Sequence, residues 1–177
     1  MGSEMCIRDR YILGLLNGNV NYFEYLYLPR PINCKIIDKL AVLVDTNLKS
    51  KKLCTAYLGY GNTMAKQYKK DKKLKQAVLS FRMLLVARGI LEYDTVFMSL
   101  PRLMEIYEFP LLRKYFDLLK NGQEFMEPEE EFFKTQKTLD EEVIEVLRNS
   151  DMREEINKKP VELLYYSLFK NEGREWN

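Results

Sequence analysis

The apolar residues of this chain recur every three or four positions over most of its length, which is the spacing of one face of an α-helix. Residues 50–70 and 72–93 show this pattern most clearly, and Ser50 is an expected helix start. Gly89 and the residues that follow it are expected to end the second helix. The expected buried positions of that helix are Leu74, Ala77, Val78, Phe81, Leu84 and Leu85, and the stem of Arg88 is a further candidate.

Two glycines, Gly59 and Gly61, interrupt the first of these helices. A glycine in a helix interior costs about 1 kcal/mol relative to alanine. We therefore expect a close helix crossing or a bound ligand at these positions, and of the two we favour close packing.

Shorter helices are predicted on the N-terminal side. Residues 11–16 have the pattern of a helix end that stops at Gly18, and Asn21 is expected to cap a short helix ending before Pro29. Residues 32–48 have helical spacing, which disfavours the alternative of a strand within them.

Towards the C-terminus, prolines and a glycine mark further helices. Pro101 and Pro110 are expected in the first turns of two helices, and Gly122 at the end of the second. Pro160 is expected to begin a last helix. The sum of these patterns predicts an all-α chain.

The chain divides into four parts by composition. The opening decamer MGSEMCIRDR would be encoded by GTG GGC TCG GAG ATG TGT ATA AGA GAC, AG and any purine, if GTG is read as a start codon, and this string resembles a transposon-based sequencing adapter. We therefore expect residues 1–10 to be an artefact and natural sequence to begin in mid-gene. A helical region is expected over residues 11–123, an acidic linker over 124–137 and C-terminal helices over 138–177.

Thr138 or Asp140 is the expected cap of the helix that follows the acidic linker. The carboxylates of Glu127, of residues 129–131 and of residues 140–142 lie in sequence that looks exposed. We interpret them as a solvated surface, and no metal site is predicted there.

Composition excludes several kinds of chemistry. The 177 residues are 46% hydrophobic and 31% charged, as in ordinary globular domains, and no apolar run is long enough to cross a membrane. The absence of histidine excludes Ser-His and Cys-His catalysis and removes the usual imidazole ligands of zinc. Cys34 and Cys54 have no CxxC spacing, so a reducing cytoplasm is the expected location.

Charge is unevenly distributed along the chain. Residues 49–88 contain eleven basic residues and one acid, a net charge of +10, whereas residues 105–155 contain 15 acids and 7 bases, a net charge of −8. The basic segment is either a surface that faces phosphates or a solvated face that the acidic segment partly neutralises. Charge alone favours the second interpretation.

Lys75 and Arg82 are the strongest candidate binding residues. They are seven positions apart, which is about two helical turns, so both lie near one face of one helix. Two such cations can hold a polyphosphate, and the guanidinium fork of arginine matches phosphate geometry. Spacing alone favours two ordinary surface cations.

Three sequence blocks resemble the DNA polymerase β-like nucleotidyltransferases, especially their RNA-ligase-associated group. The first block is LLNGNVNYFEYLYLP, with Gly18, Asn19, Asn21 and Glu24 at the positions of the family motif. The second is SKKLCTAYLGYGNTMAKQYKK. The third is KLKQAVLSFRMLLVARGIL, which is similar to the Lys-x6-Arg helix of the superfamily through Lys75 and Arg82.

This resemblance implies that the chain is the helical, bundle-like C-terminal part of an α+β nucleotidyltransferase. The parent enzyme would transfer a nucleoside monophosphate from an NTP to a hydroxyl acceptor, such as an RNA end, with Mg²⁺. Lys75 and Arg82 would line the triphosphate side of the cleft, and Asn19, Asn21 and Glu24 would brace the junction with the catalytic sheet.

The Gly-Ser and Asp-x-Asp motifs of the family and its catalytic sheet are missing, so we expect this chain alone to be inactive. Without the sheet, the apolar residues of 11–16 and 22–27 are expected to be exposed and to cause self-association.

Two other function classes stay open. One is a small helical module that binds single-stranded nucleic acid through residues 49–88, with Tyr57, Tyr60 and Tyr68 stacking on bases. The other is a helical interaction protein whose basic segment docks an acidic partner.

Overall fold

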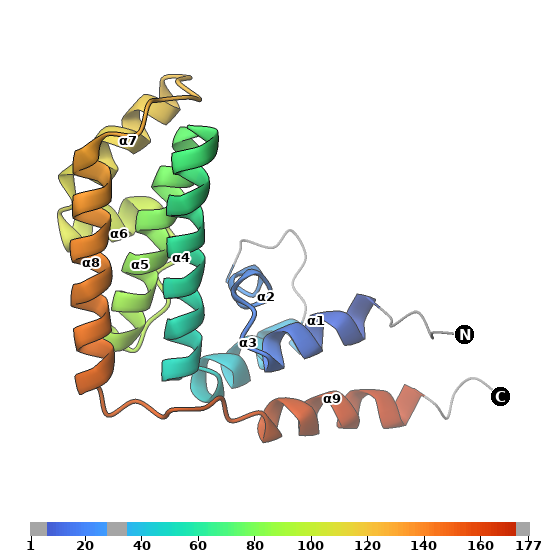
Figure 1. The fold of residues 1–177 in the computed structure, drawn as a ribbon. Coiled ribbons are helices and arrows are strands. Elements are labelled where there is room, and N and C mark those ends of the chain that lie inside the picture. Colours follow the sequence, from blue (N-terminus) through green and yellow to red (C-terminus); the bar gives the residue numbers. More distant parts are fainter. Residues whose placement is uncertain (1–6, 28–34, 173–177) are drawn as a thin grey trace. The chain divides into compact units, whose positions relative to one another are not determined.

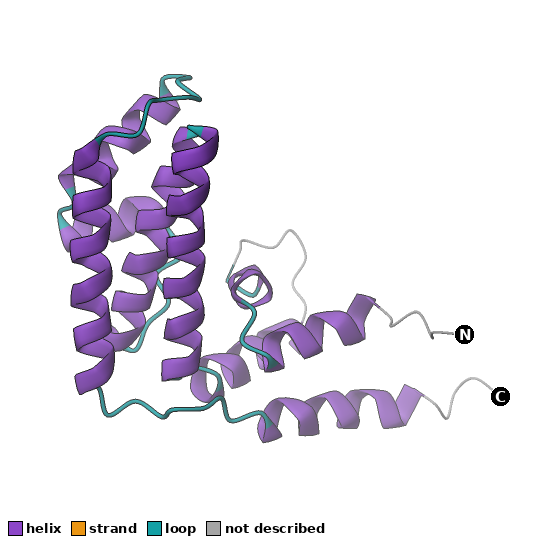
Figure 2. Ribbon diagram, in the orientation of Figure 1, coloured by secondary structure: helices purple, strands orange, loops and turns teal. Residues whose placement is uncertain are grey.

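The structure, a computed structural model, describes residues 7–27 and 35–172. These two ranges contain helices and no strand, which confirms the all-α prediction (Figure 2). Pro29, Cys34 and the first six residues of the decamer lie outside the described residues. In the described part, no helix is long and apolar enough to cross a membrane.

The helices follow one another along the chain with short connections (Figure 1). They are α1 (Ile7–Leu16), α2 (Val20–Tyr25), α3 (Lys35–Asn47), α4 (Lys51–Asp71), α5 (Leu74–Tyr93), α6 (Leu100–Tyr107), α7 (Pro110–Lys120), α8 (Glu130–Asn149) and α9 (Lys159–Glu172). The chain forms two compact units, and the division falls inside α4. Unit 1 comprises Met1–Leu53 and Arg153–Asn177, and unit 2 comprises Cys54–Met152.

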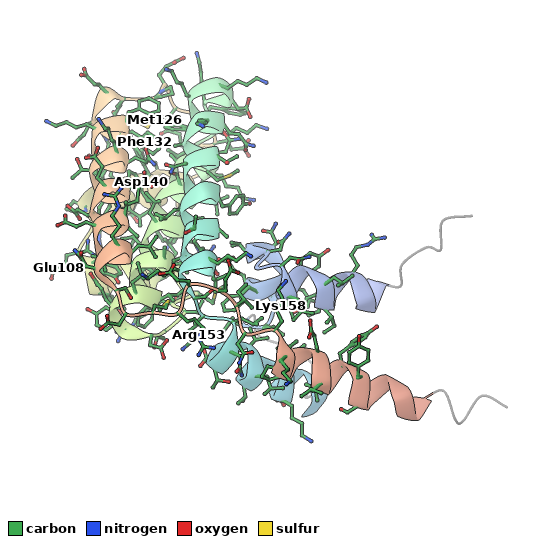
Figure 3. All side chains as sticks on the ribbon, turned by 60° about the horizontal axis from the view of Figure 1, so that its bottom comes forward. Glu108, Met126, Phe132, Asp140, Arg153 and Lys158 are labelled. Atoms are coloured by element: carbon green, nitrogen blue, oxygen red, sulfur yellow. The ribbon has the colours of Figure 1, made fainter. Side chains whose placement is uncertain are left out.

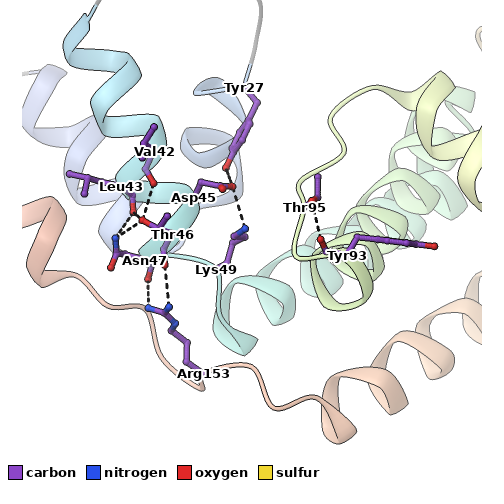
Figure 4. Close-up of polar contacts among 10 residues, drawn as sticks. All are labelled: Tyr27, Val42, Leu43, Asp45, Thr46, Asn47, Lys49, Tyr93, Thr95 and Arg153. Carbon is purple, nitrogen blue, oxygen red and sulfur yellow. Dashed lines mark hydrogen bonds and ion pairs between the residues drawn. The ribbon is translucent and has the colours of Figure 1, made fainter.

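In unit 1, a non-helical segment supplies hydrogen-bond partners at two helix ends, and Figure 4 shows those at the end of α3. The Arg153 guanidinium donates hydrogen bonds to the carbonyl oxygens of Thr46 (3.1 Å) and Asn47 (3.2 Å), at the C-terminus of α3. The carbonyl of Arg153 in turn accepts a hydrogen bond from the backbone N–H of Lys51 (2.9 Å), at the N-terminus of α4. Backbone groups at helix ends lack intrahelical partners, and this segment supplies them.

Ser50 is the cap of α4 that the sequence predicts. Its Oγ accepts a hydrogen bond from the backbone N–H of Leu53 (3.2 Å), and the residue is fully buried.

The N-terminal apolar segments of unit 1 are less exposed than expected. Leu15, Leu16 and Phe23 are buried, while Leu13 and Tyr25 are exposed. The expectation of an apolar face open to solvent over residues 11–16 and 22–27 was therefore wrong for the larger part of that face.

In unit 2, α4, α5 and α8 lie side by side, and α6 and α7 pack against α5 (Figure 1). An aromatic cluster of Tyr68, Phe81, Tyr115 and Phe132 forms the centre of this unit, and all four side chains are fully buried. The Phe132 ring centroid lies 4.8 Å from that of Tyr68 and 5.1 Å from that of Phe81. Figure 3 labels Phe132 near the N-terminal end of α8. The six apolar positions of α5 that were predicted to be buried are buried, and Arg88 is half-buried.

The prediction of an acidic linker over 124–137 was wrong in its second part, because α8 begins at Glu130. Phe132, Gln136, Leu139 and Val143 form the buried face of this helix. The charged residues between them obscure this helical spacing in the sequence. Thr138 and Asp140 consequently lie inside the helix and not at its cap.

Gly89 was expected to end α5, but the helix continues past it. It lies inside the helix, and the ring of Phe97 covers it so closely that an added Cβ would lie 2.7 Å from Phe97 Cδ2. The helix ends four residues later, where Asp94 adopts a left-handed conformation (φ 48°). The glycine is therefore explained by packing.

The glycines of α4 have different environments. An added Cβ at Gly61 would lie 3.0 Å from Leu84 Cδ2 and 3.1 Å from the Ser80 carbonyl oxygen of α5. At Gly59 there is nothing within 4 Å. The predicted close helix crossing is confirmed at Gly61 and absent at Gly59.

Candidate nucleic-acid interface

The basic segment 49–88 is partly neutralised by intramolecular ion pairs. Four of them join it to the acidic segment 105–155, namely Lys51–Glu154 (2.8 Å), Lys52–Glu155 (2.8 Å), Lys72–Glu127 and Arg88–Glu142 (3.1 Å). Lys49 pairs with Asp45 (3.5 Å), outside the acidic segment. The interpretation that the two oppositely charged segments neutralise each other is thus confirmed for part of the basic segment.

Five lysines are left over, and they gather around the turn between α4 and α5. We call them the lysine cluster: Lys66, Lys69, Lys70, Lys73 and Lys75, all exposed. None of the five forms an ion pair with any residue in the described ranges, although the Lys69 ammonium lies 5.8 Å from the Phe133 ring centroid.

The local backbone explains why these lysines lie together. Lys66, Lys69 and Lys70 have the i, i+3, i+4 spacing that places side chains on one face of α4. The chain then reverses at Lys72, whose φ is 57°, so that Lys73 and Lys75 follow within the same turn region.

An exposed aromatic side chain adjoins the lysine cluster. Phe125 lies opposite Lys73 in an isolated antiparallel bridge, flanked by hydrogen bonds from the Leu74 N–H to the Glu124 carbonyl (2.8 Å) and from the Met126 N–H to the Lys72 carbonyl (2.9 Å). Figure 3 labels Met126 beside the N-terminal end of α8. The Phe125 side chain is 57% exposed and contacts no other aromatic ring in the described part of the chain.

Sequence reasoning missed Phe125 because its segment was interpreted as a linker. The signal that could have found it is a single aromatic residue within the otherwise polar stretch NGQEFMEPEEE. A buried role would be unusual for such a segment, so an exposed aromatic was the alternative to consider.

The tyrosines predicted to stack on bases are mostly unavailable. Tyr57 and Tyr68 are fully buried, which contradicts that prediction, and Tyr60 is half-buried. The reason is helical spacing, because Tyr57, Gly61, Met64 and Tyr68 share the core-facing side of α4.

Lys75 and Arg82 both lie on α5, as expected, but in different environments. Lys75 is exposed and belongs to the lysine cluster, whereas Arg82 is half-buried. The Arg82 Nη2 donates a hydrogen bond to the carbonyl of Met98 (3.2 Å), which ties α5 to the connector before α6. A shared phosphate ligand of this pair stays a prediction.

Gly18 and Asn19 lie in the connection between α1 and α2 in unit 1, whereas Asn21 and Glu24 lie inside α2. Gly18 adopts φ 71°, and the Asn19 N–H bonds the Gly14 carbonyl (2.9 Å), as in a glycine-terminated helix end. Asn19, and not Asn21 as predicted, caps α2, since its Oδ1 accepts from the Asn21 N–H (3.1 Å). Glu24 is half-buried. Local backbone structure therefore accounts for Gly18 and Asn19 of the motif.

A polar chain crosses between α4 and α8 inside unit 2. The Gln136 Nε2 donates to Asn62 Oδ1 (2.6 Å), and the Asn62 Nδ2 donates to Asp140 Oδ1 (3.0 Å). Burial raises the pKa of Asp140, the Asn62 hydrogen bond opposes this, and the Glu141 carboxylate adds to it. In the parts of the chain that the structure describes, no group of three or more acidic or cysteine side chains is placed to hold a metal ion.

Comparison of the chain with models of protein families, with curated proteins and with solved structures finds no match. The resemblance to nucleotidyltransferases therefore rests on the three sequence blocks alone.

Proposed function

We propose that this chain binds single-stranded nucleic acid at the α4–α5 turn, through the lysine cluster and Phe125. The observation that carries the proposal is the exposed Phe125 ring opposite Lys73, among lysines without carboxylate partners in the described ranges. Proteins that bind single strands without sequence preference combine basic residues along the backbone with aromatic side chains on which bases stack.

The same observation separates this proposal from docking of an acidic protein. An acidic partner needs the lysines but gains little from a ring exposed beside them. Stacking on an unpaired base uses both the charge and the ring.

Binding of a labelled oligonucleotide of about 12 nucleotides, a length within the usual site sizes, tests the proposal by fluorescence anisotropy. The variant K66Q/K70Q/K73Q removes three cluster lysines and is expected to weaken binding at least tenfold. The matched control K39Q/R148Q/K159Q removes the same charge at exposed positions of α3, α8 and α9. Equal losses in both variants would mean that net charge alone acts, which would contradict a site at the turn.

A second proposal follows from the sequence resemblance. We propose that the chain is the helical part of a nucleotidyltransferase located in the cytoplasm, whose parent uses NTP, Mg²⁺ and a hydroxyl acceptor. Support comes from the three sequence blocks and from the position of Lys75 and Arg82 two turns apart on α5. In that case NTP competes with the oligonucleotide, and K75Q and R82Q abolish the competition while K66Q leaves it intact.

A further inference from the structure

A groove lies between the C-terminal turns of α5 and α8 in unit 2. Its volume is about 580 Å³, and its lining includes Arg88, Leu91, Glu142, Glu145, Val146 and Asp151. Arg88 is already paired with Glu92 (2.7 Å) and with Glu142 (3.1 Å). Glu145 and Asp151 form no ion pair within the described ranges and are exposed.

The groove combines apolar and acidic surface. Leu91 and Val146 supply the apolar part, and the three carboxylates outnumber the single guanidinium. Lysine side chains match such a surface, because their aliphatic stems cover apolar groups while the ammonium reaches a carboxylate.

The lysine cluster lies at the opposite end of the same unit. Lys73 and Lys75 flank the first residue of α5, whereas Arg88 and Leu91 lie in its last two turns. This helix has 20 residues, so its ends are about 30 Å apart at 1.5 Å per residue. A lysine of the cluster therefore does not reach the groove of its own unit.

We infer that the acidic groove binds the lysine cluster of a second copy of this chain. The two surfaces are complementary in charge: one end of unit 2 carries five lysines without carboxylate partners in the described ranges, and the other end carries a groove with excess carboxylates. The contact joins two different surfaces of the two copies, so it is a head-to-tail interface. Such an interface does not form a closed two-fold dimer, and further copies can add to the chain of molecules. Single-stranded nucleic acid competes for the same lysines.

The experiment uses sedimentation of the full chain and two neutralised variants at about 50 mM and about 500 mM salt, between which the screening length shortens severalfold. One variant, E145Q/D151N, loses carboxylates of the groove, and the other, K66Q/K70Q/K73Q, loses three lysines. We expect the wild type to form concentration-dependent oligomers at low salt that return to the monomer mass of 21.1 kDa at high salt. Each variant alone is expected to remain a monomer.

Mixing the two variants in equal amounts gives the decisive result. The intact lysines of one meet the intact groove of the other, so we expect a 1:1 heterodimer that grows no further. A monomeric wild type at low salt, a mixture that stays monomeric, or oligomers that persist at high salt would each overturn the inference. Persistence at high salt would indicate association through apolar surface. No step uses nucleic acid, so failure here leaves the proposed function untouched.

Discussion

Phe125 lies opposite Lys73 in an isolated antiparallel bridge, which holds an exposed aromatic ring beside the lysine cluster. The bridge joins the turn between α4 and α5 to the segment that precedes α8. Charge and ring are therefore held at one end of unit 2 by backbone hydrogen bonds, independently of any ligand.

The ring of Phe125 is expected to stack on a base. Replacing it by alanine (F125A) should lower affinity for a single-stranded oligonucleotide by about 5- to 160-fold, because stacking contributes about 1–3 kcal/mol per base. F125L keeps an apolar side chain and should lose nearly as much. The control Y166A removes an exposed aromatic of α9 and should bind like the wild type. A wild-type affinity in F125A would contradict stacking at this position.

Gly59 and Gly61 provide a matched pair of stability variants in one helix. G59A should raise the free energy of unfolding by about 0.5–1 kcal/mol, because alanine favours the helix and its Cβ meets nothing within 4 Å. G61A should lower it by about 1–2 kcal/mol, because its Cβ presses on the Ser80 carbonyl and on Leu84 of α5. Urea unfolding of both variants checks the sign of each change, and equal effects would contradict the close crossing at Gly61.

Arg153 is expected to stabilise the C-terminus of α3. R153A removes its hydrogen bonds to the Thr46 and Asn47 carbonyls and should lower the free energy of unfolding by about 0.5–1 kcal/mol, a small value because Arg153 is exposed. The Asn157 N–H still bonds the Asn47 carbonyl (3.0 Å), which limits the loss. R148A, at an exposed arginine near the end of α8, is the control and should have no effect. Amide exchange at the end of α3 should rise in R153A alone.

Asp140 is expected to give an unusual pH dependence of stability. Its pKa is raised, chiefly by burial, so the folded state holds the proton more tightly than the unfolded state. The stabilising contribution of the protonated Asp140 carboxyl to the free energy of unfolding is fully present below the pKa of the unfolded state. It is lost as the pH rises through the pKa of the folded state. D140N preserves an oxygen that accepts from Asn62 and has no charge to bury, so it should be more stable than the wild type at pH 7.

This gain should shrink at pH 3, where Asp140 is protonated in both states. E145Q, at an exposed glutamate of the same helix, is the control for a general charge effect. Urea unfolding at the two pH values measures both variants. A gain for D140N that is independent of pH, or one that E145Q reproduces, would contradict the assignment to Asp140.

The long helices could be predicted because their apolar stripes are continuous. The six predicted core positions of α5 and the cap at Ser50 follow from residue type and spacing, and the structure confirms them. The start of α8 could not be predicted in the same way, because its second buried position is the polar Gln136 and charged residues stand among the other positions of the helix. Gly89 was wrongly predicted to end α5, because the glycine is needed for tertiary packing against the Phe97 ring, which the local sequence does not show.

The candidate site was predictable in part. The excess of lysine is visible in the sequence. Which lysines form ion pairs depends on the acids that the fold brings next to them, as it brings Glu154 next to Lys51, and the sequence does not show this. Phe125 joins the cluster only through its bridge with Lys73, a pairing that no local pattern encodes. The stacking role given to Tyr57 and Tyr68 failed because aromatic residues on the apolar stripe of a helix face the core.

The salt dependence of oligonucleotide binding tests the central proposal most directly. Each phosphate neutralised on a single strand contributes about −0.7 to the slope of log K against log salt. Three to five cluster lysines therefore predict a slope between about −2 and −3.5, and K66Q/K70Q/K73Q, which keeps Lys69 and Lys75, should reduce its magnitude by about 2. A wild-type slope near zero, or no binding at about 50 mM salt, would contradict nucleic-acid binding at the α4–α5 turn.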